Sequence, residues 1–241
     1  MISVCMATYN GECFLREQID SILKQLDDDD ELIISDDGST DKTLDIIREY
    51  NDKRIKLLYN NQHNYTSNFE NALRHAKGDY IFLSDQDDIW EDNKVAITLS
   101  YLKKYDFIVS NATIIDRNNS IISNSRNSNF LIGTGFLRNI IKTYYLGCCM
   151  AFKRKVLNVA LPFPTNRSLC YHDAWITVVS ELLFKTHVCN ECLIRYRIHE
   201  NNVSSGSVGI TNSFFKMFAI RLYLFYSILR RWIALKKGNR T

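Results

Sequence analysis

Acidic side chains gather at two points where an apolar run ends, and these residues have types and spacing suited to chemistry. Asp36 and Asp37 follow the run 32–34, and Asp85, Asp87 and Asp88 lie between the apolar segments 80–83 and 89–90. Carboxylates packed together repel one another unless a cation lies among them. Oxygen-only ligand sets suit Mg²⁺ or Mn²⁺ rather than zinc. The spacing predicts a divalent-metal site, with a chance acidic cluster as the open alternative.

Alternating strand and helix patterns over the first hundred residues place both acidic groups at strand ends. Repeated units of this kind predict a mostly parallel sheet covered on both faces, with ligands beyond the carboxyl ends of the strands. Ser67 with Glu70 matches a capping box and predicts a helix start. Asp27–Asp30, by contrast, fit a solvated turn between a helix and a strand. The predicted strands are 2–6, 31–35, 55–58 and 79–83, and the predicted helices are 14–26, 41–50, 67–77 and 91–104.

After this α/β half the pattern becomes α+β, with no linker between the halves. A polar, Gly-containing stretch at 124–135 predicts a loop, and together with 136–146 and 200–212 we expect it to carry substrate contacts. The remaining predictions are strands at 107–110, 148–152, 188 and 193–198, a hairpin at 113–123 and a helix at 172–184.

The segment 213–237 interleaves aromatic and basic residues. A spanning helix needs roughly 20 largely uncharged apolar residues, whereas Arg221 interrupts this run and Arg230 with Arg231 closes it. The pattern favours an amphipathic helix lying in the bilayer interface. The alternative is a helix packed on the body or on a second subunit, as in a homodimer.

The composition agrees with a globular protein that has a substantial core. Of the 241 residues 46% are hydrophobic, and the net charge of +3 argues against a nucleic-acid binder. That charge is uneven, because 212–241 holds seven basic residues and no acidic one. The sequence opens in a strand-like pattern without a basic leader, and its seven cysteines are odd in number, so we expect a cytosolic protein with reduced, buried thiols. Cys189 and Cys192 have no second pair at zinc-finger spacing.

Six strings in order resemble the family 2 glycosyltransferases, which have the GT-A fold. The resemblance covers roughly residues 1–205 and is closest to the bacterial surface-polysaccharide, rhamnosyltransferase-like branch. The strings are Ile2–Asn10, Ser35–Asp41, Gly78–Trp90, Gly147–Phe152, His172–Trp175 and Tyr196–Asn202. The resemblance implies an α/β GT-A domain at 1–205 with one Rossmann-like, mostly parallel sheet. Its nucleotide-sugar half would be 1–110 and its acceptor half 111–205, followed by the helical tail 206–241.

The resemblance also implies a role for each matching position. Thr8, Tyr9 and Asn10 would line the nucleotide pocket, and Asp37 would accept a hydrogen bond from the base. Asp85 and Asp87 form the D-x-D pair. Asp87 would bind Mn²⁺ or Mg²⁺ together with His199, with Asp88 assisting, and the metal would neutralise the leaving diphosphate. Asp173 would be the general base, which gives inversion at the anomeric carbon.

Each assignment has a simpler structural alternative. Tyr9 could be a core aromatic, Asp37 could cap the following helix, and His199 could be a surface histidine. Asp173 could serve as an N-terminal helix acid, a role that does not exclude catalysis. Arg74 would face either the nucleotide or solvent. Two departures from the family pattern are Ala7, where many members have proline, and the lack of a Gln-x-x-Arg-Trp signature, which favours single-sugar transfer.

These features predict a metal-dependent inverting glycosyltransferase at the inner face of the cell membrane. It would move one sugar from a UDP- or dTDP-sugar, dTDP-rhamnose among the candidates, to a lipid-linked or growing surface glycan. One competing class is a sugar-nucleotide nucleotidyltransferase, but the Gly-rich phosphate loop typical of that class is missing. The other is a catalytically inactive scaffold, against which the intact acidic positions argue.

Overall fold

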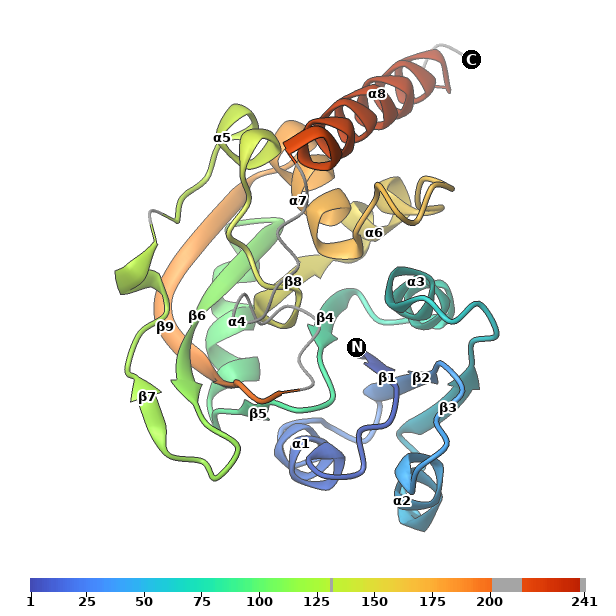
Figure 1. The fold of residues 1–241 in the computed structure, drawn as a ribbon, viewed down its shortest axis with the longest axis vertical. Helices are drawn as coiled ribbons and strands as arrows, with labels where there is room; N and C mark the ends of the chain where they lie inside the picture. The colour runs from blue at the N-terminus through green and yellow to red at the C-terminus, as the bar shows by residue number, and fades with distance from the viewer. Residues whose placement is uncertain (131, 201–213, 239–241) are drawn as a thin grey trace.

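Nine strands in the described part of the chain form one sheet, in the order β3-β2-β1-β4-β8-β6-β9-β5 with β7 paired to β6. The computed structural model describes residues 1–130, 132–200 and 214–238 (Figure 1). The strands are β1 (Ile2–Thr8), β2 (Glu31–Asp36), β3 (Ile55–Tyr59), β4 (Tyr80–Ser84), β5 (Ile89–Trp90), β6 (Phe107–Ile115), β7 (Ile121–Ser123), β8 (Met150–Lys153) and β9 (Thr186–Arg197). The helices are α1 (Leu15–Leu23), α2 (Thr43–Glu49), α3 (Tyr65–His75), α4 (Lys94–Leu102), α5 (Phe136–Ile141), α6 (Arg154–Ala160), α7 (His172–Leu183) and α8 (Phe214–Gly238). Short 3₁₀ turns lie at Asn127–Asn129 and Gly147–Cys149.

The first half is the predicted parallel α/β unit. β1 pairs in parallel with β2 and β4, and β2 pairs in parallel with β3. In this register Thr8 lies opposite Asp36, and Asp36 lies opposite Tyr59, so three segments leave the sheet at the same edge. Figure 1 shows β1–β3 between α3 on one side and α1 with α2 on the other. The acidic loops therefore start where the sheet topology places ligands.

The second half continues the same sheet in mixed orientation. β8 runs antiparallel to both β4 and β6, while β9 runs parallel to β6. The prediction of separate short strands at 188 and 193–198 is wrong, because β9 is one twelve-residue strand. Its register against β6 shifts where Val109 pairs with Val188 and Asn111 with Cys192. Asn190 and Glu191, which lie between the two predicted strands, are at this irregularity.

Two short helices and one helix start differ from the sequence prediction. α5 and α6 have six and seven residues, too few for a periodic apolar pattern to be recognised. α3 begins at Tyr65, because the Asn64 side chain accepts hydrogen bonds from the backbone of Thr66 and Ser67. The capping box at Ser67 is therefore wrong, and its acid, Glu70, is a buried ion-pair partner of Arg74 and Arg167.

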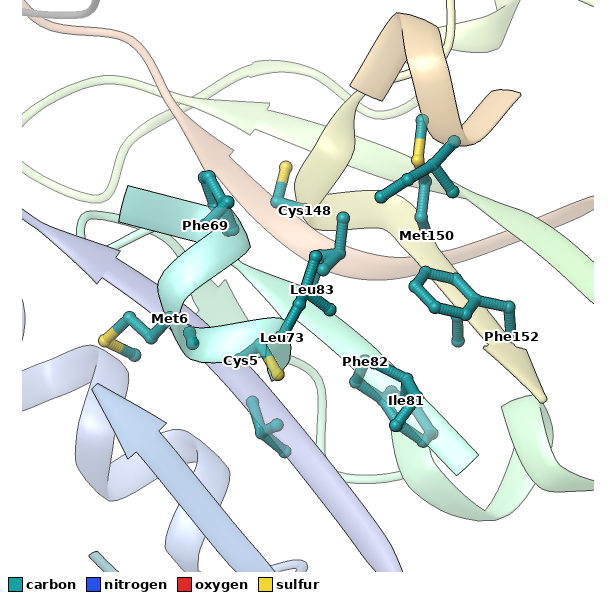
Figure 2. Packing of buried hydrophobic residues seen from close by; sticks show 14 of the residues in the cluster. Cys5, Met6, Phe69, Leu73, Ile81, Phe82, Leu83, Cys148, Met150 and Phe152 are labelled. Atoms are coloured by element: carbon teal, nitrogen blue, oxygen red, sulfur yellow. The ribbon is translucent and has the colours of Figure 1, made fainter. Parts of the chain in front are cut away.

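The core lies along the strands that join the two halves. Figure 2 shows side chains from β1, α3, β4 and β8 packed together, among them Met6, Phe69, Phe82 and Phe152. All four are buried at 3% exposure or less. Each such side chain contributes roughly 1.5–3 kcal/mol on burial. This packing holds the end of β4, from which the acidic loop at 85–88 departs, and the end of β1 beside it.

The tail helix α8 packs on the body along part of its length. Leu224 and Ile228 are buried, and the Tyr223 hydroxyl accepts a hydrogen bond from the Asn166 backbone. Arg231 donates to the carbonyls of Val159, Leu161 and Pro162 at the end of α6. Packing on the body, one of the predicted alternatives, thus holds for this face. Figure 1 shows the far end of α8 extending past α6.

A second face of α8 remains exposed and apolar. Phe215 is 82% exposed, and Phe218, Leu222 and Phe225 also face solvent. No described helix is long and apolar enough to cross a membrane. The predicted boundary at 205/206 and most of the expected loop 200–212 lie outside the described residues.

All seven cysteines are free thiols, and five of them are buried. Cys192 is half-buried and Cys13 is exposed. The prediction that every cysteine packs as a small apolar residue is therefore wrong for Cys13.

Candidate active site

The first wall of the site is the turn that follows β2. Buried Thr8 donates from Oγ1 to Asp36 Oδ2 at 2.9 Å, so this threonine organises the edge of the predicted pocket through Asp36. Asp36 also accepts hydrogen bonds from Gly38 N and Ser39 N. Gly38 has φ +84°, a conformation that favours glycine. Asp36 therefore stabilises the turn, and the carboxylate of its neighbour Asp37 is available for another role.

Asp37 is buried beneath this turn. Its Oδ1 accepts a 2.6 Å hydrogen bond from Asn60 Nδ2, and Asn60 is also bonded to Ser67 Oγ. Burial raises the pKa of the Asp37 carboxyl above its usual range. The helix-capping alternative is wrong, because Asp41, not Asp37, accepts from Thr43 at the start of α2. Asp37 is thus a positioned acceptor at the sheet edge.

Tyr9 and Asn10 follow the end of β1, and Tyr9 contacts the acidic loop after β4 while Asn10 contacts the turn after β2. The Tyr9 backbone N–H donates to Gln86 Oε1 at 2.8 Å, and Gln86 Nε2 donates back to the Tyr9 carbonyl at 3.0 Å. The Tyr9 side chain is 56% exposed, so the core-aromatic alternative is wrong. Asn10 has φ +48° and accepts from Thr40 N at 2.8 Å. These bonds tie the two predicted donor motifs to each other.

The acidic loop after β4 holds three carboxylates at different depths. Burial and the charge of Asp87 raise the pKa of Asp85 to about 7. Asp88 is fully buried, its Oδ1 accepts from Arg197 N at 3.0 Å, and its Oδ2 has no hydrogen-bond partner among the described residues. Ligand atoms of Asp85, Asp88 and Cys148 lie within 4.8 Å of one another. Cys148, for which the sequence predicted no role at this site, therefore lies beside two of the carboxylates.

Asp87 and His199 meet, although 112 residues separate them in the chain. His199 Nε2 lies 2.8 Å from Asp87 Oδ2, and both side chains are mostly buried. The Phe14 ring packs on the His199 ring, with 5.0 Å between the centroids. The Arg197 guanidinium lies over the Phe14 ring, 4.5 Å from its centroid. The alternative of an isolated surface histidine is wrong. The two atoms are at the distance of a direct hydrogen bond. Two neighbouring ligands of an octahedral ion with bonds of about 2.1 Å are about 3 Å apart, so the same separation is compatible with a shared cation.

The 3₁₀ turn at Gly147–Cys149 connects these carboxylates to the start of α7. A Cβ on Gly147 would lie 2.8 Å from His172 Nε2 and 3.7 Å from Asp173 Cβ. The next residue, Cys148, is the thiol beside Asp85 and Asp88. Asp173 Oδ1 accepts from Ala174 N at 2.7 Å, so this acid also takes the helix-start position that the structural alternative gave it. The charge of Asp173 contributes to the raised pKa of Asp85, so the two acids are close enough to interact electrostatically.

Several site residues escaped the sequence analysis. Gln86 lay inside the D-x-D string but was read as a spacer, and Arg197 lay inside the pattern that contributed His199. Asn60 carries no local signal of its role, because it acts on the distant Asp37. Gly147 begins one of the six strings, but no role was predicted for it, because its close contacts are with the distant His172 and Asp173. Arg74, left open between nucleotide and solvent, pairs with Glu70 and lines a polar cavity with Asn60 and Ser67.

The sheet order and the acidic strand ends define a GT-A type fold. The structure of S. aureus TarS 1–349 in complex with UDP-GlcNAc superimposes with a TM-score of 0.73 at 19% identity, over 92% of this chain and 66% of that chain. This chain therefore spans just under two thirds of the TarS chain. The mannosyltransferase PcManGT from Pyrobaculum calidifontis, in complex with GDP-Man and Mn²⁺, gives a TM-score of 0.63 at 19% identity, over 83% and 58% of the chains.

The glycosyl transferase family 2 model matches residues 3–160, and the chain belongs to this family. It is 30% identical over 209 residues to the Escherichia coli UDP-Glc:alpha-D-GlcNAc-diphosphoundecaprenol beta-1,3-glucosyltransferase WfgD, covering 85% of this chain and 80% of that relative. It is 28% identical over 234 residues to the Shigella flexneri dTDP-rhamnosyl transferase RfbG, covering 90% and 79%. The predicted fold and the predicted enzyme class are confirmed, which sets aside the nucleotidyltransferase alternative.

Proposed function

We propose that this glycosyltransferase is metal-dependent and inverting, and that it transfers one sugar from a nucleoside-diphosphate sugar to a lipid-linked or growing glycan. The observation that carries the proposal is the Asp87–His199 pair, with a 2.8 Å separation that suits two ligands of one cation. Asp87 and Asp173 are both close enough to Asp85 for their charges to raise its pKa. A cation site and a carboxylate base together supply both ends of a displacement at an anomeric carbon.

Asp87 and His199 would hold Mn²⁺ or Mg²⁺. When bound, the ion supplies a Lewis acid for the negative charge that grows on the leaving diphosphate. The raised pKa of Asp85 supports a cation here, because buried carboxylates this close are stabilised by a positive charge among them. His199 is held against Phe14, which fixes the direction of its ring. Arg197 anchors the loop from the other side by donating to the Asp87 carbonyl at 2.7 Å.

Asp173 would accept the proton of the acceptor hydroxyl. The hydroxyl oxygen then forms a bond to the anomeric carbon, while the bond from that carbon to the diphosphate oxygen breaks. The attack and the departure lie on opposite sides of the carbon, so its configuration inverts. Gly147 supports this geometry because its bare backbone lets the start of α7 approach the carboxylate loop.

Asp37 would read the base of the donor. Its carboxylate is fixed by Asn60 and is suited to accept the imino N–H of uracil or thymine. The exposed Tyr9 ring at the same sheet edge offers a stacking face for that base. The relatives named for UDP-glucose and dTDP-rhamnose use donors of this type, and so we propose a UDP- or dTDP-sugar, with dTDP-rhamnose among the candidates.

The metal and base roles are tested by two substitutions with separate readouts. Asp87→Ala is expected to remove Mn²⁺-dependent UDP binding in calorimetry and to abolish transfer, while circular dichroism stays unchanged. The matched control is Asp92→Ala, an exposed acid paired with Lys24 in the same stretch. Asp173→Asn is expected to keep UDP binding and to lose transfer by a factor of at least about 100. Full transfer by Asp87→Ala would refute the metal role, and full transfer by Asp173→Asn would refute the base.

We also propose that α8 holds the enzyme at the inner face of the cell membrane, where lipid-linked acceptors are found. The support is its exposed apolar face, which continues onto α5 through Leu137, 72% exposed, and Ile141. Arg230, Lys236 and Lys237 lie on the same helix and suit an anionic lipid surface. Phe215→Asp with Phe218→Asp is expected to abolish flotation with phosphatidylglycerol vesicles. The matched control replaces two exposed isoleucines of β7, Ile121 and Ile122, by Asp. Unchanged flotation of the α8 variant would refute the membrane role.

A further inference from the structure

Two tyrosine rings form a stacked pair beside the proposed base. Tyr65 is the first residue of α3, and Tyr171 immediately precedes α7. Their ring centroids are 5.9 Å apart with an interplanar angle of 26°. Tyr65 is 36% exposed and Tyr171 is half-buried, so the pair reaches the surface. Neither ring has a part in the donor and metal roles proposed above.

The pair rests on a tightly packed aromatic layer. The edge of His172 contacts Tyr65 at 6.0 Å between centroids, and Phe69 stacks on His172 at 4.0 Å with an angle of 19°. His172 is buried, and neither of its ring nitrogens has a hydrogen-bond partner among the described residues. Burial lowers the pKa of this imidazole, which keeps the ring neutral. Ring packing on this layer therefore helps to fix the position of the two tyrosines.

Asp173 is close to this pair in the chain and close to the carboxylate loop in space. It follows Tyr171 by two residues, and its own turn of helix packs on Gly147, which leads to Cys148 beside Asp85. Burial and the Asp173 charge raise the pKa of the Tyr65 phenol, so Asp173 is close enough to this ring to interact with it electrostatically. The donor diphosphate belongs on the side of the carboxylate loop. A molecule whose hydroxyl reaches Asp173 has Tyr171, two residues earlier in the chain, and the stacked Tyr65 ring nearby.

We propose that Tyr65 and Tyr171 form the acceptor subsite, on which a pyranose ring of the acceptor glycan stacks with its hydroxyl directed at Asp173. Aromatic faces carry partial negative charge, and the axial C–H bonds of a pyranose form an apolar, weakly positive face that suits them. Two fixed rings lose little side-chain freedom on binding, which favours a rigid platform over a flexible one. This inference rests on the proposed function, because it takes Asp173 as the base.

The test uses the full-length protein with single substitutions and compares the two substrates. Tyr65→Ala and Tyr171→Ala are each expected to raise the acceptor KM by about tenfold, equivalent to about 1.4 kcal/mol. The donor KM and the Mn²⁺-dependent affinity for UDP should stay within about twofold of wild type. Tyr65→Phe and Tyr171→Phe keep the aromatic face, and so we expect them to retain the wild-type acceptor KM. Tyr101→Ala is the matched control, because Tyr101 lies on α4 and stacks instead on His187.

Saturation-transfer NMR gives a second readout that a purely structural role would not change. The probes are methyl glycosides of N-acetylglucosamine, glucose and rhamnose, each added with UDP and Mn²⁺. We expect saturation of one ring face by the wild type and the Phe variants, and its loss in the Ala variants. Three results would overturn the subsite: no signal with any glycoside, equal signals in the Ala variants and wild type, or loss of UDP affinity on substitution. UDP binding and Asp173→Asn report on the proposed function separately, so the two failures are distinguishable.

Discussion

Replacing Gly147 by alanine should slow transfer without weakening donor binding. The added Cβ would lie 2.8 Å from His172 Nε2, roughly 0.6 Å inside an ordinary carbon–nitrogen contact. His172 cannot retreat freely, because Phe69 stacks on it at 4.0 Å. The strain therefore passes to the start of α7 and to Asp173, whose Cβ would be 3.7 Å from the new atom.

The magnitude follows from these contacts. Overpacking a tight core costs about 1–3 kcal/mol of stability, and a misplacement of about 1 Å at a reacting group can cost about 100-fold in rate. A displacement of roughly half that size predicts a loss in kcat of about tenfold. The assay is steady-state transfer with both substrates varied, together with UDP calorimetry and thermal unfolding.

Gly133→Ala provides the matched control. The Cβ of this variant would meet only the guanidinium of Arg138, a flexible end that can move aside. We expect a change in stability of within about 0.5 kcal/mol and an unchanged kcat. A Gly147→Ala protein with wild-type kcat and wild-type melting temperature would refute the tight contact between the 3₁₀ turn and α7.

Three further substitutions follow from buried contacts. Asp37→Asn should stabilise the protein at pH 7, because burial raises the folded-state pKa of Asp37. The wild-type carboxyl makes its full contribution to stability below its unfolded-state pKa, where it is protonated. That contribution is lost as the pH rises through its folded-state pKa. The gain in melting temperature of Asp37→Asn should therefore grow between pH 4 and pH 7, and a gain independent of pH would contradict this cause. Glu70→Gln should cost about 3 kcal/mol in urea unfolding, because it leaves Arg167 without its buried carboxylate, and a loss below about 1 kcal/mol would show that the pair contributes little. Arg231→Ala should cost about 1–3 kcal/mol and increase hydrogen exchange in α8, since the α6 carbonyls lose their donor; unchanged exchange would count against this anchor.

The sequence predicted the parallel half of the fold well because its information is local. Each strand there is a short apolar run, and the acids at 36–37 and 85–88 mark the ends of two of them. β9 was predicted less well, since a polar pair at its register shift resembles a loop when read without its partner β6. The start of α3 failed for a related reason: Glu70 fits a capping box in sequence, but its ion pair with Arg167 spans 97 residues.

The same difference between local patterns and distant contacts decided which parts of the site could be predicted. Strings with fixed spacing identified Asp87 and His199, and the structure brings the two side chains to 2.8 Å. Other supporting contacts of the site could not be predicted, because nothing near Asn60 indicates that it holds Asp37, and nothing near Gly147 indicates that it packs on His172. Their nucleotide, metal and base roles remain predictions that the substitutions above test.

The hydrogen bonds from Arg231 to the end of α6 affect which acceptors the enzyme can use. α8 has 25 residues and is therefore about 37 Å long, and it is fixed to the body through Leu224, Ile228 and Arg231. If α8 lies on the bilayer as proposed, this attachment sets a constant height of Asp173 above the lipid. The enzyme would then select acceptor glycans by their length above the membrane as well as by the identity of their sugars. On vesicles, acceptors one or two sugars too short should react poorly, and in detergent solution that preference should disappear.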